Sequence, residues 1–231
     1  YQAIIFGKAH NTPTHFSIHG TDITPRESVK LLGIHIDEKL NFGNQAAAIC
    51  KKAGQQVNAM MRLARVMDQS TKLNVYASFI LSNFMYCPAV WLCNKTSLNQ
   101  LEKVNCRALR FVYDEFNASY DELLLRKNHR RVKVIIMHAL ATEVYKCLHD
   151  LSPEYLLPTF HLQSDDHNTR NQCALVQPQF RTYSYGFQSF SYLGARIYNH
   201  LPNDIKNASC LNSFKRKLYS FTDTACMDRI I

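Results

Sequence analysis

Carboxylate pairs that could hold catalytic metal ions are scarce in this sequence. A metal-dependent polymerase or nuclease needs acidic side chains that converge on two cations, because the metals bridge the attacking and leaving oxygens. The only Asp-Asp pair is Asp165-Asp166, and it lies in the polar segment Gln163 to Asn168, which has no apolar flanks to hold it on a rigid hairpin. We therefore interpret this pair as part of a loop and assign no catalytic residue.

Cysteine and histidine spacing predicts no metal site either. Cys87 and Cys93 are separated by five residues, and no second pair stands at a spacing that zinc needs. The sequence also lacks the G-x-S-x-G elbow, the P-loop, the G-x-G-x-x-G fingerprint and the H-E-x-x-H motif. We predict neither metal nor cofactor in this chain, and an independent hydrolase or transferase is disfavoured.

Positively charged side chains are the chemistry that the sequence does offer. The 27 Lys and Arg against 18 Asp and Glu give a formal net charge of +9, which favours an acidic partner. Residues 41–116 hold nine of the cations and only four acids, and Arg126 to Lys133 adds five cations with no acid. Such runs often contact phosphates, so we predict a nucleic-acid partner.

Two predicted helices position these cations. From Asn44 an apolar stripe recurs with helical period as far as Met67. The cations on the opposite side are Lys51, Lys52, Arg62 and Arg65. A helix that begins with the capping box Ser97 and Gln100 carries its cations four and three residues apart, so that one face holds Lys103, Arg107 and Arg110. The alternative is that both faces are simply the solvated outer sides of amphipathic helices.

The remaining elements complete a predominantly helical α+β fold. Short β-type runs at 2–6, 15–18 and 29–36 predict a small antiparallel unit at the N-terminus. Further helices are predicted from an N-cap at Ser70 to the residue before Pro88, over 132–147 and over 209–221. Between 160 and 200, aromatic residues alternate with arginines such as Arg181, which suits either base stacking or the core of a mixed C-terminal lobe.

Composition also bears on the compartment. The apolar stretch Phe79 to Cys93 is interrupted by polar residues and Pro88 and is too short to span a bilayer. Eight cysteines in 231 residues fall below the density of a disulfide scaffold. We do not expect the first residues to be a signal peptide, because they have neither a basic region nor a small-residue cleavage site. We expect reduced thiols and an intracellular protein of the nucleus or cytoplasm, with no membrane partner.

Several blocks of the sequence resemble the reverse transcriptases of non-LTR retrotransposons, the jockey-like LINE elements. The resemblance covers nearly the whole chain, with Tyr198 where Trp is usual. It rests on these residues: Val29 to Asp37, Leu40, Phe42, Lys51 to Ala53, Tyr76, Ser78 to Asn83, Tyr86 to Pro88, Val90-Trp91, Leu101 to Lys103, Arg107 to Arg110, Tyr120, Glu122 to Leu124, Arg181-Thr182, Tyr185-Gly186, Ser189-Phe190, Gly194-Ala195, Asn199, Leu201-Pro202 and Phe214-Lys215.

The resemblance implies a place for each part of the chain. Residues 1–43 would be the end of the palm, with Leu32 and Gly33 in a primer-grip-like hairpin; residues 44–116 would form a helical thumb-like bundle, and 117–231 a post-thumb region. The fingers and the palm carboxylates, for which the parent polymerase would need Mg²⁺, would lie upstream. The fragment is then expected to hold the template-primer duplex and not to polymerise alone.

The expected partner is therefore an RNA template paired with a DNA primer. The residues expected to contact this hybrid are Lys51, Lys52, Lys103, Arg107, Arg110, Arg126, Lys127, Arg130, Arg131 and Arg181. Two alternatives stay open from the sequence. One is an element-derived protein-interaction module that docks through the Phe79 to Trp91 segment, and the other is a degenerate fragment without function.

Overall fold

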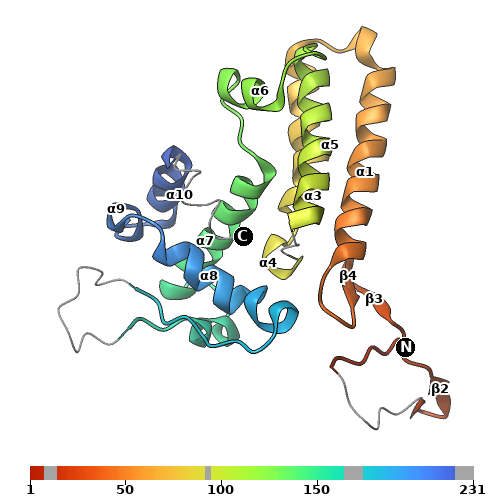
Figure 1. Cartoon of the computed structure of the whole chain (residues 1–231), viewed down its shortest axis with the longest axis vertical. Coiled ribbons are helices and arrows are strands. Elements are labelled where there is room, and N and C mark those ends of the chain that lie inside the picture. Colours follow the sequence, from red (N-terminus) through yellow and green to blue (C-terminus); the bar gives the residue numbers. More distant parts are fainter. Residues whose placement is uncertain (8–14, 92–94, 164–173, 222–231) are drawn as a thin grey trace.

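The computed structural model of the chain describes residues 1–7, 15–91, 95–163 and 174–221. Over these ranges the fold is α+β, with two small antiparallel hairpins near the N-terminus and a helical bulk (Figure 1). The fold class predicted from the sequence is confirmed at this level. No helix of the described ranges is both long and apolar enough to cross a membrane.

The two hairpins are separate. Strands β1 (Phe16–Ile18) and β2 (Thr21–Ile23) form one, and β3 (Ser28–Leu31) and β4 (Ile34–Asp37) form the other. Leu31 pairs with Ile34, so the second hairpin turns through two residues. These residues, Leu32 and Gly33, have φ of +47° and +87°, as a tight turn that follows the strand twist requires.

The strand predicted over residues 2–6 does not form. A main-chain hydrogen bond of 2.9 Å runs from Arg26 N to Ala3 O, but no strand is present at 1–7. A ladder needs successive paired residues, and this segment meets its neighbour at one such bond only. The run predicted over 29–36 is the β3–β4 hairpin rather than a single strand.

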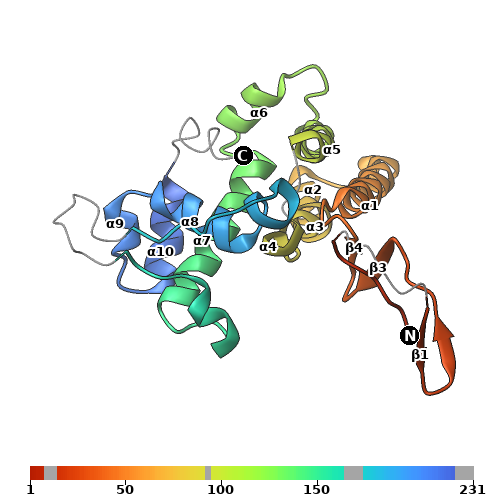
Figure 2. The ribbon, with the colours of Figure 1, turned by 60° about the horizontal axis from the view of Figure 1, so that its bottom comes forward.

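Three long helical segments stand side by side next to the hairpins (Figures 1 and 2). Helix α1 (Gly43–Arg62) is followed by a 3₁₀ turn, η1 (Ala64–Val66). The chain returns through α2 (Gln69–Val75), a π-helical segment η2 (Tyr76–Leu81) and α3 (Ser82–Met85), and then turns through α4 (Pro88–Trp91) into α5 (Lys95–Tyr113).

Two predicted helix starts are wrong, by two residues for α2 and by three for α5. Asp68, not Ser70, caps α2, because its carboxylate accepts a 2.8 Å hydrogen bond from Thr71 N. Helix α5 already includes Ser97, so the predicted capping box is not the start of that helix. The first helix also ends at Arg62 rather than near Met67, because the chain tightens into η1.

The C-terminal half is built around α7, and the helices predicted over 132–147 and 209–221 are present as α7 and α10. Its elements are α6 (Tyr120–Arg126), α7 (Val132–Leu148), η3 (Glu154–Thr159), the π-helical η4 (Tyr183–Phe187), α8 (Phe190–Asn199), α9 (Asn203–Lys206) and α10 (Leu211–Ser220). Helix α7 packs against α3, α4 and α5 and also against α8 and α10.

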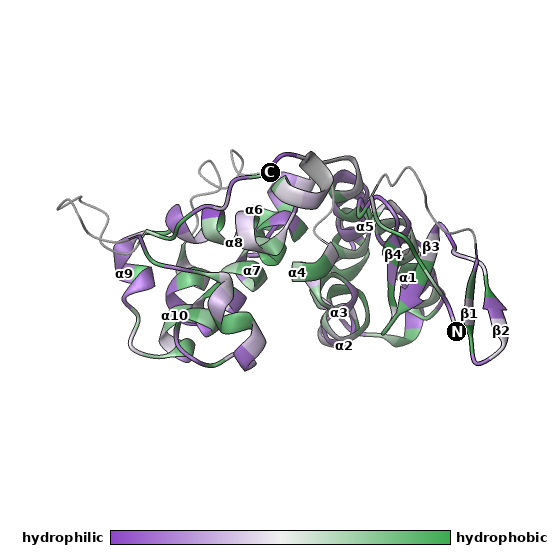
Figure 3. Cartoon of the chain, turned by 90° about the horizontal axis from the view of Figure 1, so that it is seen from below, coloured by the Kyte–Doolittle hydropathy of each residue, from purple (hydrophilic) through white to green (hydrophobic). Residues whose placement is uncertain are grey.

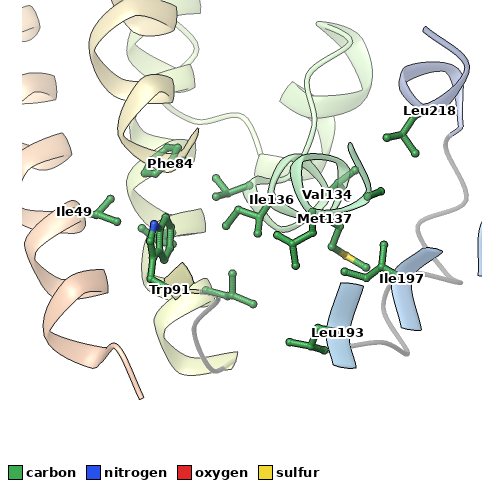
Figure 4. Close-up of a cluster of buried hydrophobic side chains, with 14 of the residues drawn as sticks. Ile49, Phe84, Trp91, Val134, Ile136, Met137, Leu193, Ile197 and Leu218 are labelled. Atoms are coloured by element: carbon green, nitrogen blue, oxygen red, sulfur yellow. The ribbon is translucent and has the colours of Figure 1, made fainter. Parts of the chain in front are cut away.

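One hydrophobic core passes through the whole arrangement. In Figure 4, Ile49 of α1 and Trp91 of α4 lie on one side of Ile136 of α7, and Ile197 of α8 lies on the other. Trp91 and Ile136 are fully buried. Figure 3 shows apolar residues along the facing sides of these helices. The division at residue 116 stays a prediction, and apolar packing crosses it.

Most of the C-terminal aromatic residues serve this core. Tyr198 is 3% exposed and stacks on Phe214, with 6.4 Å between ring centroids. Phe187 and Tyr192 are partly buried and lie 5.3 Å apart. Only Phe180 and Tyr185 of the predicted set are exposed among the residues whose burial is described. The core interpretation of this segment is therefore the one that holds for these side chains.

Candidate nucleic-acid interface

Helix α1 presents a cationic stripe without any acid. Its buried side is made of Ala46, Ala53 and Val57, each fully buried. Lys51 and Arg62 stand eleven residues apart and so share the opposite, exposed side, and Lys52 is exposed beside Lys51. Because α1 contains no Asp or Glu, nothing on this helix neutralises them.

Helix α5 presents a second cationic stripe. Leu101 and Leu109 are fully buried, whereas Lys103 and Arg107 are exposed. Arg110 is half-buried, and its Nε donates a 2.9 Å hydrogen bond to Ala118 O, which ties it to the turn after the helix. Arg110 therefore serves the fold, while Lys103 and Arg107 face solvent.

The one acid of α5 is turned away from this stripe. Glu102 accepts a 2.5 Å hydrogen bond from the Tyr120 hydroxyl through one oxygen, and a 2.9 Å bond from Lys133 N through the other. Its carboxylate thus caps the first turn of α7. It leaves the cations of α5 without an acidic partner on their own helix.

The two stripes are joined. Arg107 donates from Nη2 to Asn58 Oδ1 of α1, and the same nitrogen lies 3.8 Å from Met61 Sδ. Since Asn58 lies between Lys51 and Arg62 on the exposed side of α1, the bond makes the two exposed sides one surface, on helices that run side by side (Figure 2). We call Lys51, Lys52, Arg62, Lys103 and Arg107 the α1–α5 face. None of the five forms an ion pair with any described residue.

The run predicted over 126–133 is engaged differently. Arg126 and Lys127 reach the Glu115 carboxylate at 2.8 and 3.1 Å. Arg131 pairs with Asp121. We call Arg126, Lys127 and Arg131 the paired run, because each of them meets an acid of the same chain.

Arg130 and Arg181 are separate from both sets. The Arg130 guanidinium lies 3.9 Å from the centre of the Tyr219 ring and donates to Tyr219 O, so it faces α10. Arg181 is exposed and lies just before η4 in the C-terminal lobe. Of the predicted residues, the α1–α5 face therefore contains Lys51, Lys52, Lys103 and Arg107, whereas Arg110 and the remaining ones are engaged or placed elsewhere.

The Leu32-Gly33 turn is fixed against the helices. The Tyr86 hydroxyl, at the end of α3, donates a 2.6 Å hydrogen bond to Leu32 O. A Cβ on Gly33 would lie 3.7 Å from the same tyrosine ring. At the other end of the hairpin, Gln45 Oε1 of α1 accepts from His35 N at 2.9 Å. A rigid hairpin thus stands beside α1, and its primer-grip role stays a prediction.

A buried polar network that the sequence analysis did not predict links η2, α5 and α6. The Tyr76 hydroxyl donates to Asn105 Oδ1 at 2.8 Å, and Asn105 Nδ2 donates to the Tyr120 oxygen at 2.9 Å. Burial raises the pKa of Tyr76 well above its usual value, and burial together with the Glu102 charge raises the pKa of Tyr120. Both hydroxyls therefore keep their protons. The signal was Asn105, a polar residue on the apolar side of the predicted helix.

No metal or catalytic role was predicted for the Asp165-Asp166 pair or for the cysteines. Asp165, Asp166 and Cys93 lie outside the described residues. Across residues 1–7, 15–91, 95–163 and 174–221, no three His, Cys, Asp or Glu side chains gather as a metal site would need. The five cysteines whose state is described, including the exposed Cys87, are free thiols.

Comparison with known proteins adds no relative. No protein-family model matches the sequence, and no significant match was found among curated proteins or solved structures.

Proposed function

We propose that this chain holds an RNA–DNA duplex through the α1–α5 face, as part of the RNA-directed DNA polymerase of a non-LTR retroelement. One observation carries the proposal: two adjacent helices join their exposed sides through Arg107 and Asn58, and the cations there meet no acid of the described chain. The choice of an RNA–DNA duplex as the ligand rests on the sequence blocks that resemble such reverse transcriptases.

The chemistry of the face fits a backbone ligand rather than a particular base sequence. Flexible ammonium groups such as those of Lys51, Lys52 and Lys103 act as mobile point charges toward phosphate oxygens. The deep major groove of an A-like hybrid cannot be read by side chains, so recognition works through shape, phosphates and sugar hydroxyls. We therefore expect binding with little sequence preference. The α1–α5 face binds the duplex backbone, whereas the reacting groups would belong to the upstream palm.

Binding of a short RNA–DNA hybrid, followed by fluorescence anisotropy between low and moderate salt, tests the proposal. Counterion release makes log affinity fall linearly with log salt, with a slope of about −0.9 for each phosphate neutralised. Five cations therefore predict a slope of about −4.5. The proposal fails if the hybrid does not bind, or if its affinity does not change with salt.

A second candidate function rests on a different observation. Phe79, Met85, Tyr86 and Val90 are each exposed by between 43 and 55% along the η2–α3–α4 edge. Exposed apolar side chains such as these suit a protein partner, as in the interaction-module alternative. A stoichiometric protein partner recovered after nuclease treatment, and lost on replacing Phe79 and Val90 by Ser, would support it over duplex binding.

A further inference from the structure

A large groove lies between the two halves of the molecule, away from the α1–α5 face. Its volume is about 970 Å³, and it is enclosed by α3 and α4 on one side and by α7, α8 and α10 on the other. Met85, Val90, Ala139 and Leu218 are among the apolar residues of its wall. Grooves of this size between helices are typical sites for small molecules.

One end of the groove has unsatisfied polar atoms. Arg130 Nε and His138 Nε2 are both buried from solvent, and neither has a hydrogen-bond partner among the described residues. Both residues line the groove. A buried polar atom without a partner costs free energy, so this end of the groove favours a ligand that offers acceptor oxygens.

The unpaired charge along the groove is positive. Lys146 of the wall is paired with Glu143 at 2.8 Å, which leaves Arg130 and the exposed Lys215 as the cations that line the groove without an ion pair to a described acid. Burial and the nearby Arg130 charge lower the pKa of His138 to about 4. The imidazole is therefore neutral at pH 7 and can donate one N–H.

We propose that this groove binds a free amphiphile with one acidic group and an apolar chain, the class to which long-chain carboxylates belong. Its carboxylate would accept hydrogen bonds from Arg130 and His138, and its chain would lie along Met85, Val90 and Ala139. The exposed Tyr219 ring, which stacks on Arg130, would turn aside to admit the acidic group. This inference goes beyond the proposed function and does not depend on it.

The side chains that line the groove disfavour other classes of ligand. A nucleotide or a sugar would bring several polar groups against side chains such as Leu81, Ile135 and Leu156, which line the groove and offer no hydrogen bonds. A wholly apolar ligand would leave Arg130 Nε and His138 Nε2 unpaired. Only a ligand that is apolar along most of its length and acidic at one end satisfies both parts.

The single tryptophan of the chain reports on the groove. Trp91 is fully buried at the end of α4, one residue from Val90 of the wall. Bromine on an alkyl chain quenches tryptophan fluorescence at short range. We would titrate the full chain with ω-bromoundecanoate below its critical micelle concentration, and with ω-bromoundecanol as the neutral match.

The expected result is saturable quenching at one equivalent, with the acid about tenfold tighter than the alcohol because charge-assisted hydrogen bonds are the stronger ones. Arg130→Met and His138→Leu should each reduce this preference, and Ala139→Phe should block quenching. Lys51→Met, which removes a cation of the α1–α5 face, is the matched control and should bind as the wild type. Circular dichroism checks that each variant is folded.

Three results would overturn the proposal. They are the absence of saturable quenching, equal affinity for the acid and the alcohol, and a preference for the acid that survives in a folded Arg130→Met variant. Quenching that occurs only when the probe is dissolved in phosphatidylserine vesicles would also overturn it, because the groove would then contact a membrane surface rather than a free amphiphile.

Discussion

The α1–α5 face and the paired run show two fates of cations that look alike in the sequence. Both contain lysines and arginines whose pattern in the sequence predicts contact with phosphates. In the folded chain, Lys51 and Lys103 meet no acid, whereas Arg126 and Lys127 share the Glu115 carboxylate. The difference arises because Glu115, between α5 and α6, and Asp121, in the first turn of α6, both lie within reach of the run.

This difference teaches that local charge density is a poor guide to charge available for a ligand. A phosphate that approaches the paired run must compete with a carboxylate already in place. One that approaches the α1–α5 face competes with water and counterions only. The net charge of the chain supports long-range attraction to nucleic acid, but the contacts depend on which cations are unpaired.

The largest expected effect comes from neutralising the α1–α5 face. Replacing Lys51, Lys52 and Lys103 together by Gln should weaken hybrid binding by about two to three orders of magnitude near 0.1 M salt, because each lost phosphate contact changes the salt slope by about 0.9. The matched control replaces Arg126, Lys127 and Arg131 by Gln and should cost less than about tenfold. Equal losses in the two triple variants would erase the comparison.

The second prediction tests what holds the paired run in place. Asn105 is fully buried and links Tyr76 to Tyr120. Asn105→Ala should lower the free energy of unfolding by about 2 kcal/mol, because it leaves the buried Tyr76 hydroxyl without its acceptor and removes the amide donor to the Tyr120 oxygen. Urea denaturation measures this loss, and Asn58→Ala, at an exposed site, should change stability by less than about 0.5 kcal/mol. A similar loss in both variants would contradict the role of the network.

The third prediction concerns pH. Burial, together with the Arg130 charge, lowers the pKa of His138 in the folded chain to about 4, from about 6.5 when unfolded. Between these values the unfolded state holds more protons, so unfolding becomes easier as pH falls, by up to about 1.4 kcal/mol per pH unit. His138→Leu should remove this part of the slope. Denaturation curves at pH 7, 6 and 5 measure how the free energy of unfolding depends on pH. If His138 were freely solvated in the folded chain, this dependence would be the same in His138→Leu and in the wild type.

The smallest expected effect comes from releasing cations of the paired run from their acid. Glu115→Gln should release Arg126 and Lys127 from their shared acid and raise hybrid affinity by about threefold through the added charge. Its cost in stability should stay below about 1 kcal/mol, since both pairs are partly exposed. Unchanged or weaker hybrid binding in a folded variant would show that pairing does not limit this run.

The sequence predicted the helices that carry the face because their periodicity is regular. Buried Ala53 and Val57 recur opposite Lys51 on α1, and Leu101 and Leu109 recur opposite Lys103 on α5, so period alone assigned the exposed sides. The pattern did not predict the Leu32-Gly33 turn, because residues 29–36 form one continuous β-type run in the sequence; a hairpin at this place was implied only by the family resemblance.

What the sequence could not predict depends on contacts between distant residues. Nothing local indicates that Arg107 reaches Asn58, 49 positions earlier in the chain, or that Glu102 turns toward Tyr120 rather than toward its own helix face. The start of α2 also differs from the prediction. Asp68 and Ser70 can both cap a helix, and in the folded chain Asp68 is the N-cap. The groove beside Arg130 is formed by helices far apart in sequence and had no local signal.

Lysine footprinting tests the central claim most directly. The chain would be acetylated briefly with and without a saturating RNA–DNA hybrid, and the modification of each lysine would be measured by mass spectrometry. The account predicts that the hybrid protects Lys51, Lys52 and Lys103 several-fold, while Lys127 and Lys146, which are paired with Glu115 and Glu143, keep their modification. Protection that is uniform, or that is concentrated on Lys127 and Lys146, would contradict it.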